Sequence, residues 1–206
     1  MRLLFNEGNE KKQNTHDFFL CSLPFDKIDD IVKTIKTIPH KINYKNELIV
    51  EGEIYLAKKQ FEKINKQIEK EGGQLYANPR NLAAGTIRQL DSEMVRERNL
   101  DAFLYDIART QDEPETQFEE LKWLSEKGFL VEKNFILARN IDEVIKFWKK
   151  FDSQKEKLEF MIDGVVVKVN DKKFQRYLAV DSAAVSAFTC SSLDKPSNSF
   201  SHSALW

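Results

Sequence analysis

The chain has 206 residues, which is long enough for one domain with a sizeable core and short for two. Its 32 Lys and Arg nearly balance its 33 Asp and Glu, and the formal net charge of -1 argues against a uniformly basic nucleic-acid-binding module. The two cysteines, Cys21 and Cys190, are too few for a zinc site or a disulfide framework, and neither a signal peptide nor a membrane-spanning run is evident. We therefore expect a soluble, cytoplasmic chain whose phosphate contacts come from local groups of Arg and Lys.

The composition divides the chain into three zones. Residues 1–25 are polar and show no clear period, so they stay unassigned. Residues 26–171 carry a strong and locally consistent pattern, and they form the predicted domain. Residues 172–206 form a serine-rich, low-complexity tail that can bury little apolar surface, and we expect this tail to be poorly ordered.

Apolar periods and turn residues predict the elements of the central zone. The segment ELIVEGEIYLA has the β-branched character of a strand, and Gly52 within it marks a bulge or a close approach of two backbones. Asn140 is placed to cap a helix whose Ile145 and Trp148 should face inward. In chain order we expect a strand at 47–57, helices at 58–71 and 82–90, a strand at 100–108, a helix at 117–127, an extended segment at 129–137, a helix after 140 and a strand at 160–169.

This order of elements predicts an α+β fold. Few tight strand–helix–strand units occur, so antiparallel sheets flanked by helices are favoured over a doubly wound parallel sheet. The sequence contains no internal repeat.

The stretch YANPRNLAAGTIRQ has the most specific pattern in the chain. Asn78-Pro79 fixes a turn, so Arg80 should lie at a junction between a loop and a helix. Gly85 costs a helix about 1 kcal/mol relative to alanine, which suggests close packing at that point. Arg80 and Arg88 are eight positions apart, so their guanidinium groups should lie on neighbouring helix faces and suit contacts with phosphate oxygens. A solvated helix with incidental arginines is the alternative.

Two strand segments carry charged groups that a ligand could reach. Glu53 follows Gly52, where a carboxylate could accept hydrogen bonds from sugar hydroxyls, although glutamate on a half-exposed strand usually only faces solvent. In IDGVVVKV, strand alternation puts Val166 and Lys168 on one face. A lysine on an apolar strand is costly to bury unless it meets an anion, which could be a phosphate or the carboxylate of a structural salt bridge.

These segments together resemble a known family. VEGEIYL, YANPRNLAAGTIRQLD, AFLYDI and IDGVVVKVND are similar, in that order, to successive motifs of the adenylation (nucleotidyltransferase) domain of bacterial NAD-dependent DNA ligases. TIKTIPHKI resembles the segment before them. The resemblance covers about residues 26–171 and implies a partial adenylation domain, incomplete at both ends. Its NPRN-to-RQLD block is highly specific, whereas DGVVVKV is shared more widely among nucleotidyltransferases.

The resemblance also implies roles for individual residues at a nucleotide site. Glu53 matches the glutamate that contacts the adenosine ribose, and Tyr105 lies in the motif that packs an aromatic ring near the nucleotide. Lys168 matches the lysine that neutralises the phosphate next to adenosine, and Asp163 belongs to the same catalytic motif.

The implied reaction seals nicks in duplex DNA during replication and repair. NAD donates AMP to the enzyme, AMP passes to the 5′-phosphate of the nick, and a phosphodiester forms, with Mg2+ assisting. Arg80 and Arg88 match arginines that engage nicked DNA and help to place its 5′-phosphate. The resemblance implies a monomer, and we assign no residue of the chain as a metal ligand.

The sequence departs from the family at the nucleophile. The family's adenylated lysine lies in a Lys-x-Asp-Gly motif, whereas the position two before Asp163-Gly164 is Met161 here, and the chain contains no other Asp-Gly pair. An adenylated intermediate needs a nucleophilic amine. We therefore expect this chain alone to be inactive, as a fragment or as the product of a disrupted gene.

Two other hypotheses stay open. The chain could be a non-catalytic DNA- or nucleotide-binding remnant that keeps Arg80, Arg88 and Lys168 and prefers nicked over intact duplex. It could also be an inert, partly folded remnant, because loss of the strand that carries the nucleophile would leave a sheet edge unpaired. A cooperative thermal transition would argue against the inert remnant.

Overall fold

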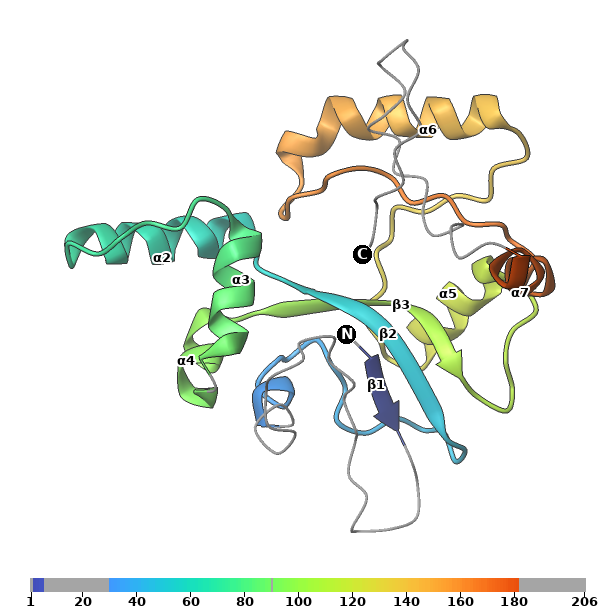
Figure 1. Ribbon diagram of the computed structural model, residues 1–206, viewed down its shortest axis with the longest axis horizontal. Coiled ribbons are helices and arrows are strands. Elements are labelled where there is room, and N and C mark those ends of the chain that lie inside the picture. The colour runs from blue at the N-terminus through green and yellow to red at the C-terminus, as the bar shows by residue number, and fades with distance from the viewer. Residues whose placement is uncertain (1, 6–29, 90, 182–206) are drawn as a thin grey trace.

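The computed structural model describes residues 2–5, 30–89 and 91–181, which form a three-stranded antiparallel sheet surrounded by helices (Figure 1). The predicted α+β fold with antiparallel strands and flanking helices is confirmed. In chain order the elements are β1 (Arg2–Phe5), β2 (Leu48–Tyr55), α2 (Lys58–Lys70), α3 (Pro79–Arg88), α4 (Ser92–Arg98), β3 (Asp101–Arg109), α5 (Gln117–Glu126), α6 (Ile141–Gln154), the short helix η1 (Lys155–Lys157) and α7 (Lys172–Asp181).

The sheet is built around β2, which pairs antiparallel with β1 on one edge and with β3 on the other. Strand β1 comes from the segment that the sequence left unassigned, whereas β2 and β3 lie where the sequence predicts strands. Gly52 sits at a register shift between β2 and β3, and a Cβ atom there would lie 2.1 Å from the carbonyl oxygen of Phe103. Both structural features predicted at Gly52, the bulge and the close approach of two backbones, are therefore present.

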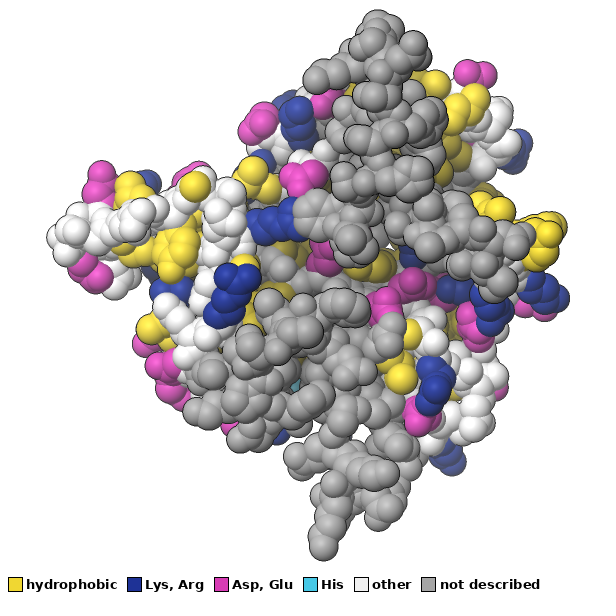
Figure 2. All heavy atoms as spheres, in the orientation of Figure 1, with side chains coloured by type: hydrophobic (Ala, Val, Ile, Leu, Met, Phe, Trp, Pro, Cys, Tyr) yellow, Lys and Arg dark blue, Asp and Glu magenta, His cyan; other side chains and the backbone are white. Residues whose placement is uncertain are grey.

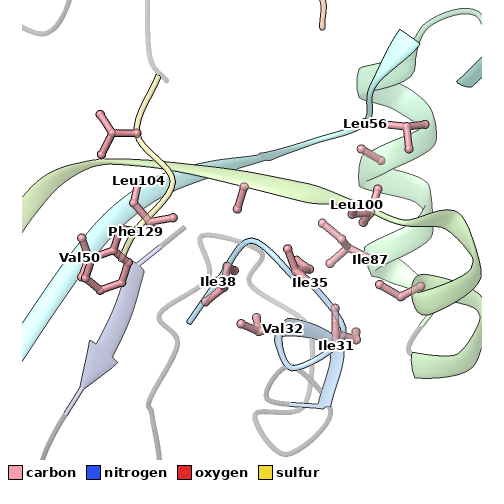
Figure 3. Packing of buried hydrophobic residues seen from close by; sticks show 14 of the residues in the cluster. Ile31, Val32, Ile35, Ile38, Val50, Leu56, Ile87, Leu100, Leu104 and Phe129 are labelled. Atoms are coloured by element: carbon pink, nitrogen blue, oxygen red, sulfur yellow. The ribbon is translucent and has the colours of Figure 1, made fainter. Parts of the chain in front are cut away.

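The hydrophobic core covers the face of the β2–β3 pair that carries Val50 and Leu104 (Figure 3). Segment 30–38, helices α3 to α5 and the segment after α5 supply the apolar side chains that pack against these two strands. The buried members are Ile31, Val32, Ile35, Ile38, Leu48, Val50, Leu56, Leu82, Ala83, Ile87, Val95, Leu100, Ala102, Leu104, Ile107, Leu124, Phe129 and Val131. The opposite face of β2 and β3 is left for charged and aromatic side chains.

Side-chain caps and glycines set the ends of the predicted helices. Asn78 Oδ1 accepts a hydrogen bond from the backbone N–H of Asn81 at 2.8 Å, so α3 begins at Pro79 and not at residue 82. Asn140 caps α6 as predicted, by accepting a hydrogen bond from the N–H of Glu143. The helices α2 and α5 end just before glycines with positive φ, as their sequences indicate.

The α-helices α4 and α7 were not predicted. Helix α4 follows Asp91, whose carboxylate accepts hydrogen bonds from two backbone N–H groups, and it ends at Asn99 in the left-handed conformation. Helix α7 occupies residues 172–181, the first part of the tail that was expected to be poorly ordered. Asp171 accepts from the first free N–H groups of α7, and Lys172 is buried, so local capping and an anchored side chain order this part. Residues 182–206 of the predicted tail lie outside the described residues.

The predicted strand at 160–169 is wrong. Within the described part of the chain, this segment has no regular secondary structure and is not in the sheet. A β-branched sequence forms a strand only when a neighbouring strand accepts and donates its ladder hydrogen bonds. The valines of this segment consequently stay accessible, and Val166 and Val169 are 59% and 42% exposed.

Helix α6 is less buried than the sequence predicts. Ile145 and Trp148 were expected to face inward, but both are only half-buried, and no residue of α6 is fully buried. The helix stands apart from the sheet (Figure 1), and its Trp148 lines a small hollow with Ile162 and Val165 of the irregular segment. Because that segment forms no sheet, α6 has no continuous apolar layer to pack on. No helix of the described residues is both long and apolar enough to cross a membrane.

The cap of α3 leads to a prediction about the NPRN motif. Asn78→Ala removes the acceptor for the Asn81 N–H, and we expect the free energy of unfolding to fall by about 1 kcal/mol. Asn78→Ser keeps a capping oxygen, so the free energy of unfolding should fall by only a few tenths of a kcal/mol, about the error of the measurement. Urea denaturation of the two variants measures the difference, and equal losses would contradict a capping role for Asn78.

Candidate functional site

The open face of the sheet collects acidic and aromatic side chains at a β-bulge. The register passes from Gly52 opposite Leu104 to Glu51 opposite Asp106, so Tyr105 is the extra residue on β3. A bulge re-aims the side chains that follow it. Ile107 consequently returns to the core, while Tyr105 and Asp106 both lie on the side of Glu51 and Glu53.

Lys168 comes to this face from the irregular segment that follows α6. Its Nζ lies 3.1 Å from Asp106 Oδ2 and 5.5 Å from the centre of the Tyr105 ring. The side chains of Lys168 and Asp106 are 30% and 28% exposed, so the pair is open to a ligand from solvent. The sequence predicted that Lys168 would meet either a phosphate or a carboxylate, and in the structure it pairs with the carboxylate of Asp106.

The segment next to Lys168 is fixed to the start of α5. The backbone carbonyl oxygen of Asn170 accepts a hydrogen bond from the Gln117 N–H at 2.7 Å. The side-chain oxygen of Asn170 accepts a second one from the Phe118 N–H at 3.1 Å. Gln175 of α7 donates to Gln117 Oε1 and to the carbonyl oxygen of Val169. These contacts, with an isolated antiparallel β-bridge between Asp171 and Thr116, hold the backbone next to Lys168 in place.

Tyr105 stays a neutral phenol on this face. Burial is the main cause that raises the pKa of Tyr105, and together with the negative charges of Glu53, Glu51 and Asp106 it brings that pKa to about 12. A neutral phenol keeps its O–H as a hydrogen-bond donor and its ring as a stacking surface. Tyr105 thus shares this face of the sheet with Glu53, and Lys168 lies over its ring.

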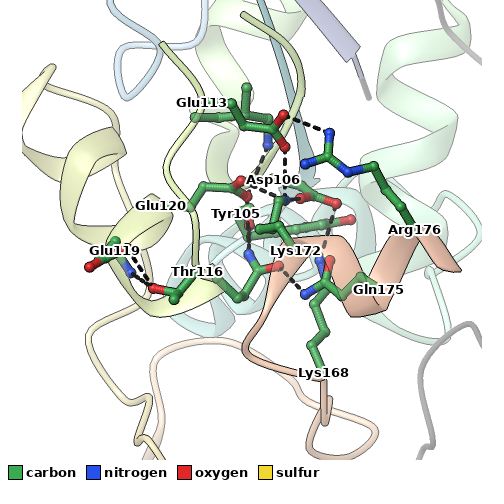
Figure 4. Close-up of polar contacts among 12 residues, drawn as sticks. Tyr105, Asp106, Glu113, Thr116, Glu119, Glu120, Lys168, Lys172, Gln175 and Arg176 are labelled. Carbon is green, nitrogen blue, oxygen red and sulfur yellow. Dashed lines mark hydrogen bonds and ion pairs between the residues drawn. The ribbon is translucent and has the colours of Figure 1, made fainter. Parts of the chain in front are cut away.

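Behind Lys168 lies a buried ionic network that the sequence did not predict (Figure 4). Lys172 of α7 has a side chain only 7% exposed, and its Nζ lies 2.6 Å from Glu120 Oε2 and 3.2 Å from Asp106 Oδ1. Glu113 lies at 3.9 Å from the same Nζ and pairs with Arg176 at 3.0 Å. Asp106 therefore bridges the buried cation of Lys172 and the accessible cation of Lys168.

Burial and the neighbouring carboxylate make Glu120 a weak acid. Desolvation is the main cause that raises the pKa of Glu120 to about 7, and its hydrogen bond with Asp106 adds to this, while Lys172 opposes it. For Asp106, burial alone would raise the pKa, but the hydrogen bond with Glu120 and the charges of Lys168 and Lys172 outweigh burial and lower it. Near neutral pH, Asp106 is thus the charged member of this carboxyl pair.

This difference predicts a pH effect on stability. Glu120 has a folded pKa above its ordinary value of 4.5, so its contribution to the unfolding free energy is complete below that value and is lost as the pH rises towards about 7. The loss is at most about 3 kcal/mol, at 1.36 kcal/mol for each pKa unit. Glu120→Gln removes this titration, and its amide oxygen can still accept the hydrogen bond from the Ile107 N–H.

We therefore expect the unfolding free energy of Glu120→Gln to depend less steeply on pH than that of the unmodified chain between about pH 5 and pH 8. Urea denaturation at several pH values measures the two slopes. Glu119→Gln, on the exposed side of the same helix, is the control and should follow the unmodified chain. Parallel curves for all three proteins would contradict the raised pKa of Glu120.

The two arginines of the NPRN block lie at opposite ends of α3. Arg80 is at its first turn and forms an exposed ion pair with Asp163 at 3.5 Å, while Arg88 is exposed at its last residue. The ring of Tyr76 packs on Gly85 between them, at 3.5 Å from a Cβ built there, which accounts for a small residue in this helix. The visible face of the molecule shows basic and acidic side chains interspersed (Figure 2), in line with the balanced net charge.

A comparison with known protein families gives a match over most of the chain. Residues 25–185 match the model of the NAD-dependent DNA ligase adenylation domain. The chain belongs to this family. All six residues that the sequence singles out lie within the match, which also extends past residue 171 and includes α7.

Full-length relatives of this adenylation domain are DNA ligases. The DNA ligase of Mycoplasma mycoides is 45% identical over 150 residues, or 73% of this chain and 22% of the relative. Those of Thermosipho africanus and Thermotoga maritima are 45% and 41% identical and are matched over 24% and 23% of their length. The chain thus spans less than a quarter of the length of each of these relatives.

Proposed function

We propose that this chain forms the part of an NAD-dependent DNA ligase that contacts the ribose and phosphate of the adenylate. The whole enzyme would seal nicks in duplex DNA, in replication and repair, through enzyme adenylation, AMP transfer to the 5′-phosphate and phosphodiester formation. NAD is the AMP donor, nicked duplex is the other substrate, and the cytoplasm is the proposed location. The observation that carries this proposal is the convergence of Glu53, Tyr105 and Lys168 on the open face of β2 and β3.

Each residue on this face has a chemical role in the proposal. The Glu53 carboxylate accepts hydrogen bonds from the ribose hydroxyls, and the neutral Tyr105 ring packs near the nucleotide. Lys168 neutralises the phosphate next to adenosine and so favours departure of nicotinamide mononucleotide. Asp163 belongs to the same motif as Lys168, and its ion pair with Arg80 links this motif to the start of α3.

DNA contacts are proposed for the arginines of α3. Arg80 and Arg88 are both exposed, and guanidinium groups suit bidentate contacts with phosphate oxygens. No group of three or more His, Cys, Asp or Glu residues that could hold a metal ion occurs within the part of the chain that the structure describes.

We further propose that the 206-residue chain does not adenylate itself. Residues 1–49, upstream of Glu53, contain no Lys-x-Asp-Gly motif, and the one Asp-Gly pair of the chain has Met161 in place of the lysine. Intact-mass measurement after incubation with NAD and Mg2+ tests this proposal. The chain should gain no AMP, while the full-length ligase of Thermotoga maritima, treated in the same way, should gain one. A stable gain of one AMP by the 206-residue chain would overturn it.

Calorimetric titration of the same chain tests the nucleotide site. AMP should bind about tenfold more tightly than adenosine, because a charge-assisted contact with phosphate contributes roughly 1.5 kcal/mol. Lys168→Gln should abolish this difference. Lys173→Gln removes an exposed charge five residues away and should keep it. Equal affinities of the unmodified chain for AMP and adenosine would overturn the assignment of Lys168.

A further inference from the structure

We propose that Asp106 and Lys172 position the Lys168 ammonium group for the phosphate next to adenosine. The inference rests on the proposed role of Lys168 and adds two positioning residues to it. Asp106 lies in the AFLYDI motif without a role assigned from the sequence, and Lys172 directly follows the IDGVVVKVND motif. Both lie behind Lys168 in the network of Figure 4.

The geometry assigns separate partners to the two oxygens of Asp106. Oδ2 lies 3.1 Å from Lys168 Nζ, and Oδ1 lies 3.2 Å from Lys172 Nζ. Each oxygen thus accepts a charge-assisted hydrogen bond, which restricts rotation of the carboxylate about its own bond. An Asp106 carboxylate held in this way can in turn restrict the Lys168 side chain.

Lys172 is itself anchored in the protein interior. Its side chain is 7% exposed, and its Nζ lies 2.6 Å from Glu120 Oε2. The other oxygen of Glu120 accepts hydrogen bonds from the backbone N–H of Ile107 at 3.1 Å and from the side-chain amide of Gln117 at 3.0 Å. A continuous series of contacts therefore runs from the backbone of β3 through Glu120, Lys172 and Asp106 to Lys168.

Positioning matters because lysine has a long, flexible side chain. Fixing such a side chain at the moment of binding costs conformational entropy, and a side chain that is already held avoids part of that cost. Lys168 Nζ has three N–H donors, so it can keep Asp106 and still donate to a phosphate oxygen.

The alternative is that Asp106 competes with phosphate for Lys168. In that case loss of the Asp106 charge would strengthen AMP binding through a more positive surface potential. High salt separates the two effects, because about 0.5 M salt screens charges beyond roughly 4 Å, while a contact between a positioned ammonium and phosphate is screened less.

The experiment measures how much more tightly AMP binds than adenosine, by calorimetric titration of the 206-residue chain in about 0.5 M salt. Asp106→Asn should reduce this AMP preference about fivefold, since a neutral amide holds Lys168 less well. Lys172→Met should reduce it similarly, and Lys172→Arg should restore most of it. Arg176→Met removes the same charge from α7 one turn later, where Arg176 pairs only with Glu113 among the contacts described above, and should leave it unchanged.

The outcomes distinguish failure of the positioning role of Asp106 and Lys172 from failure of the proposed nucleotide site. An AMP preference that depends on Lys168 but is unchanged or increased in Asp106→Asn would overturn the positioning role and leave the nucleotide site standing. Absence of any AMP preference in the unmodified chain would overturn both. If Lys172→Met does not fold, as its thermal melt would show, Asp106→Asn and Lys172→Arg still decide the matter.

Discussion

Gly52→Ala should cost about 3 kcal/mol of unfolding free energy, the upper end of the range for substitutions that overpack a buried site. The added Cβ would lie 2.1 Å from the carbonyl oxygen of Phe103 and 2.8 Å from the Leu104 side chain. A flexible side chain could move away, but the Phe103 carbonyl belongs to β3 and can move only if the strands separate. Since the bulge at this point places Tyr105 and Asp106, their face would be disturbed as well. Urea denaturation measures the loss.

Gly85→Ala is the matched control for Gly52→Ala. A Cβ at residue 85 would meet the Tyr76 ring at 3.5 Å, which is an ordinary contact, and alanine is favoured over glycine in a helix by about 1 kcal/mol. We expect Gly85→Ala to be neutral or stabilising. A loss of less than about 1 kcal/mol in Gly52→Ala would show that the strands can open without penalty and would contradict the close approach.

Lys172→Met should destabilise the chain by about 3 kcal/mol near neutral pH, because removal of one partner leaves buried carboxylates without their cation. The carboxylates concerned are those of Glu120 and Asp106. The cost should shrink at lower pH, where Glu120 takes up a proton and no longer needs a counter-charge. Denaturation at about pH 5 and about pH 8 measures both the loss and its dependence on pH.

Two further variants test the cause of this loss. Lys173→Met, the exposed neighbour on α7, should change stability by less than about 0.5 kcal/mol. The double variant Lys172→Met/Glu120→Gln removes the cation and one carboxylate together, so it should recover about half of the loss. Equal losses in Lys172→Met and in the double variant would contradict the ionic origin.

Much of the fold follows from local sequence signals. The helix capped by Asn140, the strand around Gly52 and the stop after α5 each depend on residues within a few positions, and each lies where it was predicted. The strand at 160–169 failed for a different reason. Its β-branched residues indicate a strand, but strand formation depends on a hydrogen-bonding neighbour that no local pattern can supply.

The residues of the candidate site were also predicted only in part. The family motifs identified Glu53, Tyr105 and Lys168, which the structure places on one face. The sequence did not predict the ionic network of Asp106, Glu120 and Lys172. These residues are up to 66 positions apart, and each has the local sequence pattern of a solvated charge. Lys172 carries no local signal of a buried partner, because the exposed Lys173 lies in the same first turn of α7, where the helix dipole disfavours a cation equally.

The irregular segment around Lys168 also bears on how the chain behaves at high concentration. Three consecutive valines, from Val165 to Val167, precede Lys168, and Val169 follows it. Such β-branched runs associate between molecules when they are exposed, and a charge within or beside them opposes this association. We therefore expect Lys168 to oppose association of these segments in addition to its proposed role. An apolar residue at position 168 would make residues 165–169 one continuous apolar segment, which favours aggregation. Glutamine is therefore a better replacement for Lys168 than methionine or alanine in a binding experiment.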